Sequence, residues 1–129
     1  MDTKETFEAV CKRIGDHYSA KENYKVFKKK VKWTGTYLNC EMCFWSSHSN
    51  MANEYVCLEI VTSVYANDKT DMDKKGLLYV GIRPKSFNVC NLTDTLFSEI
   101  ISFMDEKTEY VKTLDTPEEL KRLKEEINR

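Results

Sequence analysis

Apolar and polar residues alternate along the stretch from Thr36 to Tyr65. This stretch predicts the central element of the fold, against which the other elements pack. Two alternating runs, 37–45 and 55–65, flank a polar segment of small residues at 46–53. Alternation of this kind predicts two β-strands joined as a hairpin. Because successive side chains of a strand point to opposite faces, the even positions predict an apolar face that other elements must cover. Its members are Leu38, Cys40, Met42, Phe44, Val56, Leu58, Ile60 and Val64.

The odd positions of the hairpin predict a face of a different kind, in which aromatic rings alternate with carboxylates and thiols. Such a face is too polar for a core and too apolar for a surface that meets only water. Aromatic anchors ringed by charge are typical of protein recognition, so we expect a protein partner here. The contact residues we expect are Tyr37, Glu41, Trp45, Tyr55, Glu59 and Tyr65, with His48 in the hairpin loop beside them.

Helical spacing and strand patterns predict the elements on either side of the hairpin. An apolar stripe from Phe7 to Tyr18 predicts a helix across the even face of the hairpin. The lysine-rich segment 24–33 predicts an edge strand, on which lysines discourage pairing with a second chain. Residues 77–82 predict a short strand that Pro84 ends, because proline cannot donate to a sheet ladder.

The last third of the chain predicts two helices. Apolar residues between 92 and 104 recur at helical spacing, and Thr116-Pro117 followed by Glu119 is a strong helix start. The fold class we predict is therefore α+β, with an N-terminal helix, an antiparallel four-stranded meander sheet and two C-terminal helices. Residues 1–129 form one domain in this interpretation, a length that can bury a sufficient core without metals or disulfides.

The amino-acid composition limits the classes of partner that this protein is expected to bind. Twenty basic against twenty-one acidic residues give a net charge of −1, which argues against a general attraction to nucleic acid or anionic lipid. The lysines at 21–32 with Tyr24, Phe27 and Trp33 leave an RNA or single-stranded DNA surface as a less favoured alternative. The sequence shows neither a membrane-spanning run nor a signal-peptide pattern, so we expect a cytoplasmic protein with reduced cysteines.

The Cys40–Cys43 pair has the spacing of a zinc or redox motif, and His48 lies close downstream. Positions three apart on a strand point to opposite faces, whereas a zinc knuckle needs both sulfurs on one side. We therefore favour buried free thiols and expect neither a metal nor a cofactor.

Two carboxylates on the odd face, Glu41 and Glu59, raise the alternative of a small enzyme or ligand-binding domain that also uses His48. A hairpin loop symmetric about Asn50 would place Glu41 opposite Glu59 and Cys43 opposite Cys57. Facing like charges are destabilising, so either the register differs by two residues or a lysine among Lys28, Lys30 and Lys32 neutralises them. We favour an ion-paired face over catalysis, and name no catalytic residue.

The first half of the chain resembles a bacterial family of domains of unknown function. The residues that carry the resemblance are Tyr24-Lys25-Val26-Phe27-Lys28-Lys29-Lys30 and Phe44-Trp45-Ser46-Ser47-His48-Ser49-Asn50. Members of that family show Gly-Phe-Lys-Lys and Gln-Ser-Ser with a following asparagine; here Tyr24-Lys25 stands for Gly-Phe, and Trp45 for glutamine. The resemblance implies a small cytoplasmic α+β protein of no assigned activity, and some proteins of this layout are immunity proteins that neutralise a toxin.

Overall fold

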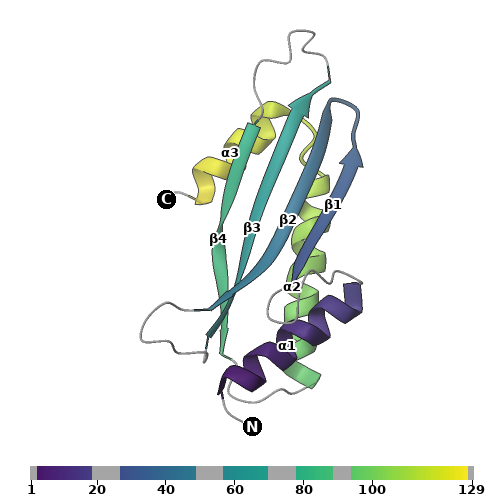
Figure 1. The fold of residues 1–129 in the computed structure, drawn as a ribbon. Coiled ribbons are helices and arrows are strands. Elements are labelled where there is room, and N and C mark those ends of the chain that lie inside the picture. Colours follow the sequence, from purple (N-terminus) through teal and green to yellow (C-terminus); the bar gives the residue numbers. More distant parts are fainter. Residues whose placement is uncertain (1–2, 19–26, 49–56, 70–77, 89–93, 128–129) are drawn as a thin grey trace.

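The computed structural model describes residues 3–18, 27–48, 57–69, 78–88 and 94–127 (Figure 1). Its four strands form one antiparallel sheet in the order β1-β2-β3-β4, which confirms the predicted meander. One helix precedes the sheet and two follow it, so the predicted α+β fold is also confirmed. The elements are α1 (Thr3–Tyr18), β1 (Lys28–Thr34), β2 (Leu38–His48), β3 (Cys57–Asp68), β4 (Leu78–Asn88), α2 (Asp94–Lys112) and α3 (Pro117–Ile127).

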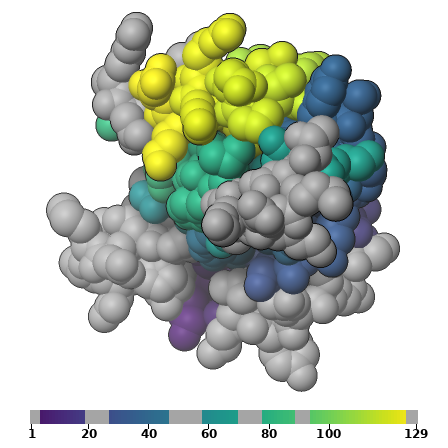
Figure 2. Space-filling model, turned by 90° about the horizontal axis from the view of Figure 1, so that it is seen from above, coloured from purple at the N-terminus to yellow at the C-terminus, as the bar shows by residue number. Residues whose placement is uncertain are grey.

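A single hydrophobic core joins one face of the sheet to all three helices. The predicted even face is buried at each described position, and the helices add apolar stripes to the same cluster. Figure 1 shows α2 and α3 behind the sheet and α1 across its lower end, and the end-on view in Figure 2 shows α2 and α3 as a layer on one side of the strands. The helices contribute Phe7, Val10, Cys11, Ile14, Ile100, Met104, Val111, Leu120 and Leu123.

The register of the central hairpin differs from the symmetric arrangement considered above. Glu41 lies opposite Tyr65 rather than Glu59, and Cys43 lies opposite Ser63. The shift is six residues rather than the two considered from the sequence, and β2 continues through the first part of the predicted loop as far as His48. Ser46 is buried, and its hydroxyl accepts a hydrogen bond of 3.1 Å from the N–H of Phe27, so this serine belongs to the sheet and not to the loop.

Strand β4 does not end at Pro84, so this prediction is wrong. The strand continues to Asn88 through a β-bulge, since Thr62 pairs with Ile82 and Ile60 with Lys85. One residue of β3 therefore faces two residues of β4, Arg83 and Pro84. β4 is an edge strand, and at a bulge on an edge the missing N–H of proline removes no ladder hydrogen bond.

Strand β1 is the other edge of the sheet, as predicted, but it runs from Lys28 to Thr34. The predicted start at Tyr24 lies outside the described residues. Exposure alternates along β1, with Lys29, Val31 and Trp33 half-buried on the helix side. Consequently the other lysines of the strand, Lys28 among them, project from the opposite face.

Asp115, between α2 and α3, connects the helical layer to the turn between β1 and β2. Its carboxylate accepts hydrogen bonds from three consecutive N–H groups, at 2.6 Å from Thr36, 3.3 Å from Tyr37 and 3.2 Å from Leu38. The predicted start of α3 is confirmed beside it. The Thr116 hydroxyl accepts a hydrogen bond of 3.2 Å from the N–H of Glu119, so threonine caps the helix.

Candidate functional site

The face of the sheet opposite the core, called here the open face, is defined by rows of side chains that the strand register brings together. None of the described helices packs on this face (Figure 1). In particular, α3 packs on the core side, since Leu120 and Leu123 are buried in the core cluster. The rows are Thr34–Asn39–Asn67, Lys32–Glu41–Tyr65–Tyr79, Lys30–Cys43–Ser63–Gly81, Lys28–Trp45–Val61 and Glu59–Ser86.

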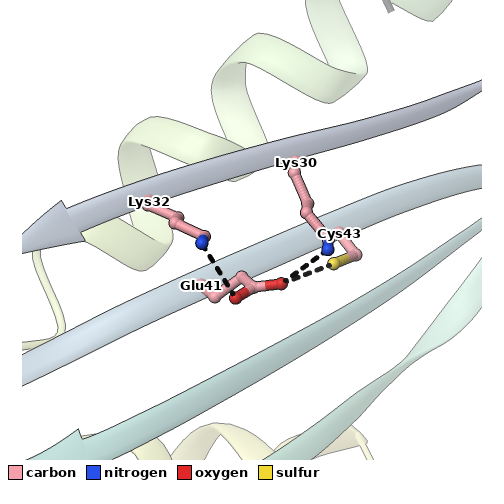
Figure 3. Close-up of polar contacts among 4 residues, drawn as sticks. All are labelled: Lys30, Lys32, Glu41 and Cys43. Atoms are coloured by element: carbon pink, nitrogen blue, oxygen red, sulfur yellow. Dashed lines mark hydrogen bonds and ion pairs between the residues drawn. The ribbon is translucent and has the colours of Figure 1, made fainter.

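Glu41 stands at the centre of a charged cluster on the open face (Figure 3). The Lys30 ammonium lies 3.5 Å from Oε1 of Glu41, and the Lys32 ammonium lies 3.9 Å from Oε2. The Cys43 thiol donates to Oε1 at 3.7 Å. Burial raises the pKa of the Cys43 thiol, and the Glu41 carboxylate raises it further. The thiol therefore stays neutral and serves as a donor. Lys30 and Lys32 of β1 supply the counter-charge of Glu41, which was one of the two alternatives that the sequence left open.

Two tyrosines continue the row of Glu41 toward the β4 edge. The ring centroids of Tyr65 and Tyr79 are 5.1 Å apart and the rings are tilted by 52°. This distance lies within the range of favourable aromatic contacts. The Tyr79 side chain lies along its own strand, over Gly81. A Cβ atom placed on Gly81 would be 3.1 Å from the hydroxyl oxygen of Tyr79. Gly81 thus leaves room for the ring, and nearly half of the Tyr79 side chain is exposed.

Small side chains form the middle of the open face. Cys43 and Ser63 face each other across β2 and β3, and both are buried although no described helix covers them. The buried hydroxyl oxygen of Ser63 has no hydrogen-bond partner within the described part of the chain.

A pocket of about 350 Å³ opens at the end of the open face nearest the β1–β2 turn. Its polar lining comes from two neighbouring rows: Lys32, Thr34, Asn39, Glu41, Tyr65 and Asn67. A larger hollow of about 940 Å³ lies between β4 and α2, beside Phe87, Phe103 and Glu106, and its lining includes no residue of the predicted site. The pocket on the open face combines amide, ammonium and phenol groups that could hold a polar side chain of a partner.

The structure brings together some of the predicted site residues and separates others. Glu41 and Tyr65 are neighbours, and Trp45 lies on the same face, half-buried between Lys28 and Val61. Tyr37 is exposed in the β1–β2 turn, at the end of the face.

Glu59 lies at the other end of the open face, opposite Ser47 and Ser86. The position opposite Glu41, Tyr65, is six residues along β3 from Glu59, and at about 3.3 Å per residue the two carboxylates are about 20 Å apart. His48 ends β2, with its backbone opposite Leu58, and its side chain is outside the described set. Tyr55 also lies outside the described residues.

Cys40 and Cys43 lie on opposite faces of β2, as their spacing predicts. Cys40 belongs to the core, and burial raises its pKa to about 11. Across the described ranges, no group of three histidine, cysteine, aspartate or glutamate side chains is arranged to hold a metal ion. None of the described helices has the length and apolar composition that crossing a bilayer requires.

Tyr79 and the two asparagines, Asn39 and Asn67, are residues of the open face that the sequence-based site omits or leaves unused. Tyr79 belongs to the face only because β4 pairs with β3 in the register that sets it opposite Tyr65. The alternation of Leu78, Tyr79 and Val80 was a signal for a two-faced strand, but the pairing partner was needed to say which face Tyr79 shares.

No protein-family model, no curated protein and no solved structure matches this chain.

Proposed function

We propose that this protein is a non-catalytic binding protein that recognises a protein partner through the open face of its sheet. The observation that carries the proposal is the one-sided placement of the described helices. The C-terminal helix, which would have removed the site by folding over the open face, packs on the core side instead. A face that carries aromatic and charged side chains, and that no described helix covers, is the kind of surface on which protein partners dock.

The composition of the open face supports a protein partner over a purely solvated surface. Trp45, Tyr65 and Tyr79 supply aromatic area, and such side chains are enriched among the residues that dominate interface energetics. Lysines and Glu41 surround them, which supplies the charged rim that fixes orientation. The pocket beside Tyr65 gives the partner a place to insert a polar group.

The register separates the two carboxylates, Glu41 and Glu59, that the enzyme alternative requires to act together. Carboxylates that act together on one glycosidic bond lie about 5 to 10 Å apart, whereas Glu41 and Glu59 are separated by about 20 Å along the sheet. Glu41 is also held by two lysines and a thiol. Binding without chemistry is therefore the better account of Glu41.

An immunity-type role, in which the partner is a toxin that the protein neutralises, is the most specific form of this proposal. It rests on the resemblance to a bacterial family described above and on fold-level analogy. An open sheet face with aromatic anchors would suit such tight recognition, and the cytoplasm would be its place of action.

The test is a pull-down from cell lysate with two matched variants. The double variant Trp45→Ala, Tyr79→Ala removes aromatic area from the open face, and Tyr110→Ala removes an equally exposed tyrosine from α2. Thermal unfolding first establishes that each variant folds. A protein retained by the wild type and by Tyr110→Ala, but lost with the double variant, is the expected result. Equal retention by all three baits would contradict the proposal.

A further inference from the structure

We propose that the partner adds a β-strand to the outer edge of β1, and that this strand carries acidic residues at alternate positions. The inference rests on the proposed function and specifies how the partner is held and what chemistry it has. In strand addition, main-chain hydrogen bonds provide affinity and alternate side chains provide specificity.

The two edges of the sheet differ in their suitability for an added strand. At the β4 edge, the bulge at Arg83 and Pro84 interrupts the ladder. β1 contains neither glycine nor proline, and its seven residues pair one by one with β2 without a register shift. No described strand lies outside β1 in the sheet. The β1 edge is therefore the regular, available template.

The hydrogen bonds at the two ends of β1 show which backbone groups point outward. Gly35 donates to the carbonyl of Leu38 at 2.8 Å, and Ser46 donates to that of Phe27 at 3.3 Å. Hydrogen-bonded pairs alternate with non-bonded pairs in an antiparallel ladder, so the odd residues from 27 to 35 bond to β2. The N–H and C=O groups of the even residues, Lys28, Lys30, Lys32 and Thr34, therefore face the free edge.

The same even residues select the charge of the partner. The side chains of Lys28, Lys30 and Lys32 project on the open face, and the latter two remain 53% and 72% exposed despite their contact with Glu41. Residues directly opposite across an antiparallel pair interact, and opposite charges there are stabilising. A strand with glutamate or aspartate at every second position would meet this row. A second copy of β1 would instead place lysine against lysine, which disfavours self-association.

The residues of β1 that face the helices indicate which side chains the added strand should carry at its remaining alternate positions. Val31 and Trp33 point toward the helices but are only half-buried, unlike the fully buried core positions of β2. An apolar residue of the partner beside them would extend the core by one strand and remove more of their surface from water. Acidic residues on one face and apolar residues on the other define the strand that fits.

The probe is a capped seven-residue peptide of alternating glutamate and valine, as long as β1. Amide hydrogen exchange measured by NMR should show new protection at Lys28, Lys30 and Lys32 when the peptide is added. The control peptides are the lysine–valine version and the glutamate–valine version with N-methylated backbone. Single-stranded oligothymidine serves as a third control, since lysines beside aromatic rings also suit a phosphate backbone.

A pair of variants separates backbone pairing from charge. Lys30→Ala removes the ammonium and keeps the outward N–H, whereas Lys30→Pro removes both. Proline is tolerated at edge positions whose N–H faces solvent, so Lys30→Pro should fold, which circular dichroism checks. Loss of one backbone hydrogen bond weakens binding about fivefold, so Lys30→Pro should bind at least about fivefold more weakly than Lys30→Ala.

Protection confined to the glutamate–valine peptide, together with the proline effect, supports strand addition to β1. Equal affinity of both variants, absence of new protection at millimolar peptide, or protection by oligothymidine alone overturns it. The proposed function has a separate readout: a protein partner lost with Trp45→Ala, Tyr79→Ala but leaving the β1 amides unprotected would retain face recognition and reject the added strand. If the pull-down captures no such partner and the peptide does not bind, both the proposed function and the added strand are rejected.

Discussion

A Cβ atom at Gly35 would overlap the carboxylate of Asp115, so the turn between β1 and β2 and the link between α2 and α3 touch at this point. The close approach brings the carboxylate within reach of the N–H groups of Thr36, Tyr37 and Leu38. Lys69, the residue after β3, reinforces the turn by donating from its backbone N–H to the carbonyl of Tyr37 and from its ammonium to that of Gly35. The outer end of the sheet is thereby fastened to the helical layer.

Gly35→Ala should lower the free energy of unfolding by about 1 to 3 kcal/mol, because the added methyl forces the Asp115 carboxylate away from the turn. Urea denaturation measures the change. In an Asp115→Ala background the same substitution should cost clearly less, since the obstructing group is gone. An equal cost in both backgrounds would show that the overlap is not the cause.

Asp115→Ala alone should lower the free energy of unfolding by about 2 kcal/mol, the scale of hydrogen bonds to a charged group. Glu106→Ala, which removes an exposed carboxylate from α2, is the matched control and should change stability little. The loss should also appear locally, as faster amide exchange at Thr36 and Leu38. Unchanged exchange at these amides would contradict the anchoring role.

Tyr18→Phe should destabilise the contact between α1 and α2 by about 1 kcal/mol. The Tyr18 hydroxyl donates to Asp105 at 2.7 Å, and burial, with Asp105 beside it, raises the pKa of the phenol well above its usual range. The phenol is therefore a neutral donor throughout the physiological pH range. A double-mutant cycle with Asp105→Ala isolates the pair, and Tyr110→Phe controls for removal of an exposed hydroxyl. Additive losses in the cycle would argue against coupling.

The elements of the fold could be predicted from local pattern because each has a marked periodicity or a distinct start. The apolar stripe of α1, the alternation in β2 and β3 and the Thr116–Glu119 cap all depend on residues close in sequence. The end of β4 could not be predicted in this way. Pro84 stops a central strand, but at a bulge on an edge strand it is tolerated, and strand order is a tertiary property.

The candidate site depended on register, which the loop sequence did not determine. A shift of β3 by six residues relative to the symmetric hairpin separated Glu41 from Glu59 and brought Tyr65 and Tyr79 into the row of Glu41. The shift is even, so every side chain kept its face, and for this reason the division into core and open faces was still correct. A lysine of β1 was one of two alternatives for neutralising Glu41, and Lys30 and Lys32 do reach it, since alternate positions of the strand lie on one face.

Glu41→Gln should change the free energy of unfolding by less than about 1 kcal/mol, because ion pairs at exposed sites contribute little. The same substitution should alter binding at the open face, since it leaves Lys30 and Lys32 without their internal counter-charge and strengthens their attraction for an acidic partner. Denaturation and peptide affinity measured on one preparation separate the two effects. A large stability loss with unchanged affinity would make Glu41 a structural residue only.

The stability of the protein should fall between pH 9 and pH 11 in a way that depends on Cys11. Burial in the core raises the pKa of this thiol from its ordinary value of 9.0 to about 11. Between these values the unfolded chain loses the proton and the folded chain keeps it, so unfolding becomes more favourable as pH rises.

The expected loss from Cys11 is about 2 kcal/mol, the order that a shift of this size implies for a buried group. Cys11→Ala removes it, so the stability advantage of the wild type over this variant should narrow by that amount as pH rises from 9 to 11. Val10→Ala, a truncation on the same buried side of α1 without a titrating group, should keep a constant difference from the wild type. Urea denaturation at stepped pH provides the measurement, and a constant difference for Cys11→Ala would show that the thiol ionises equally in both states.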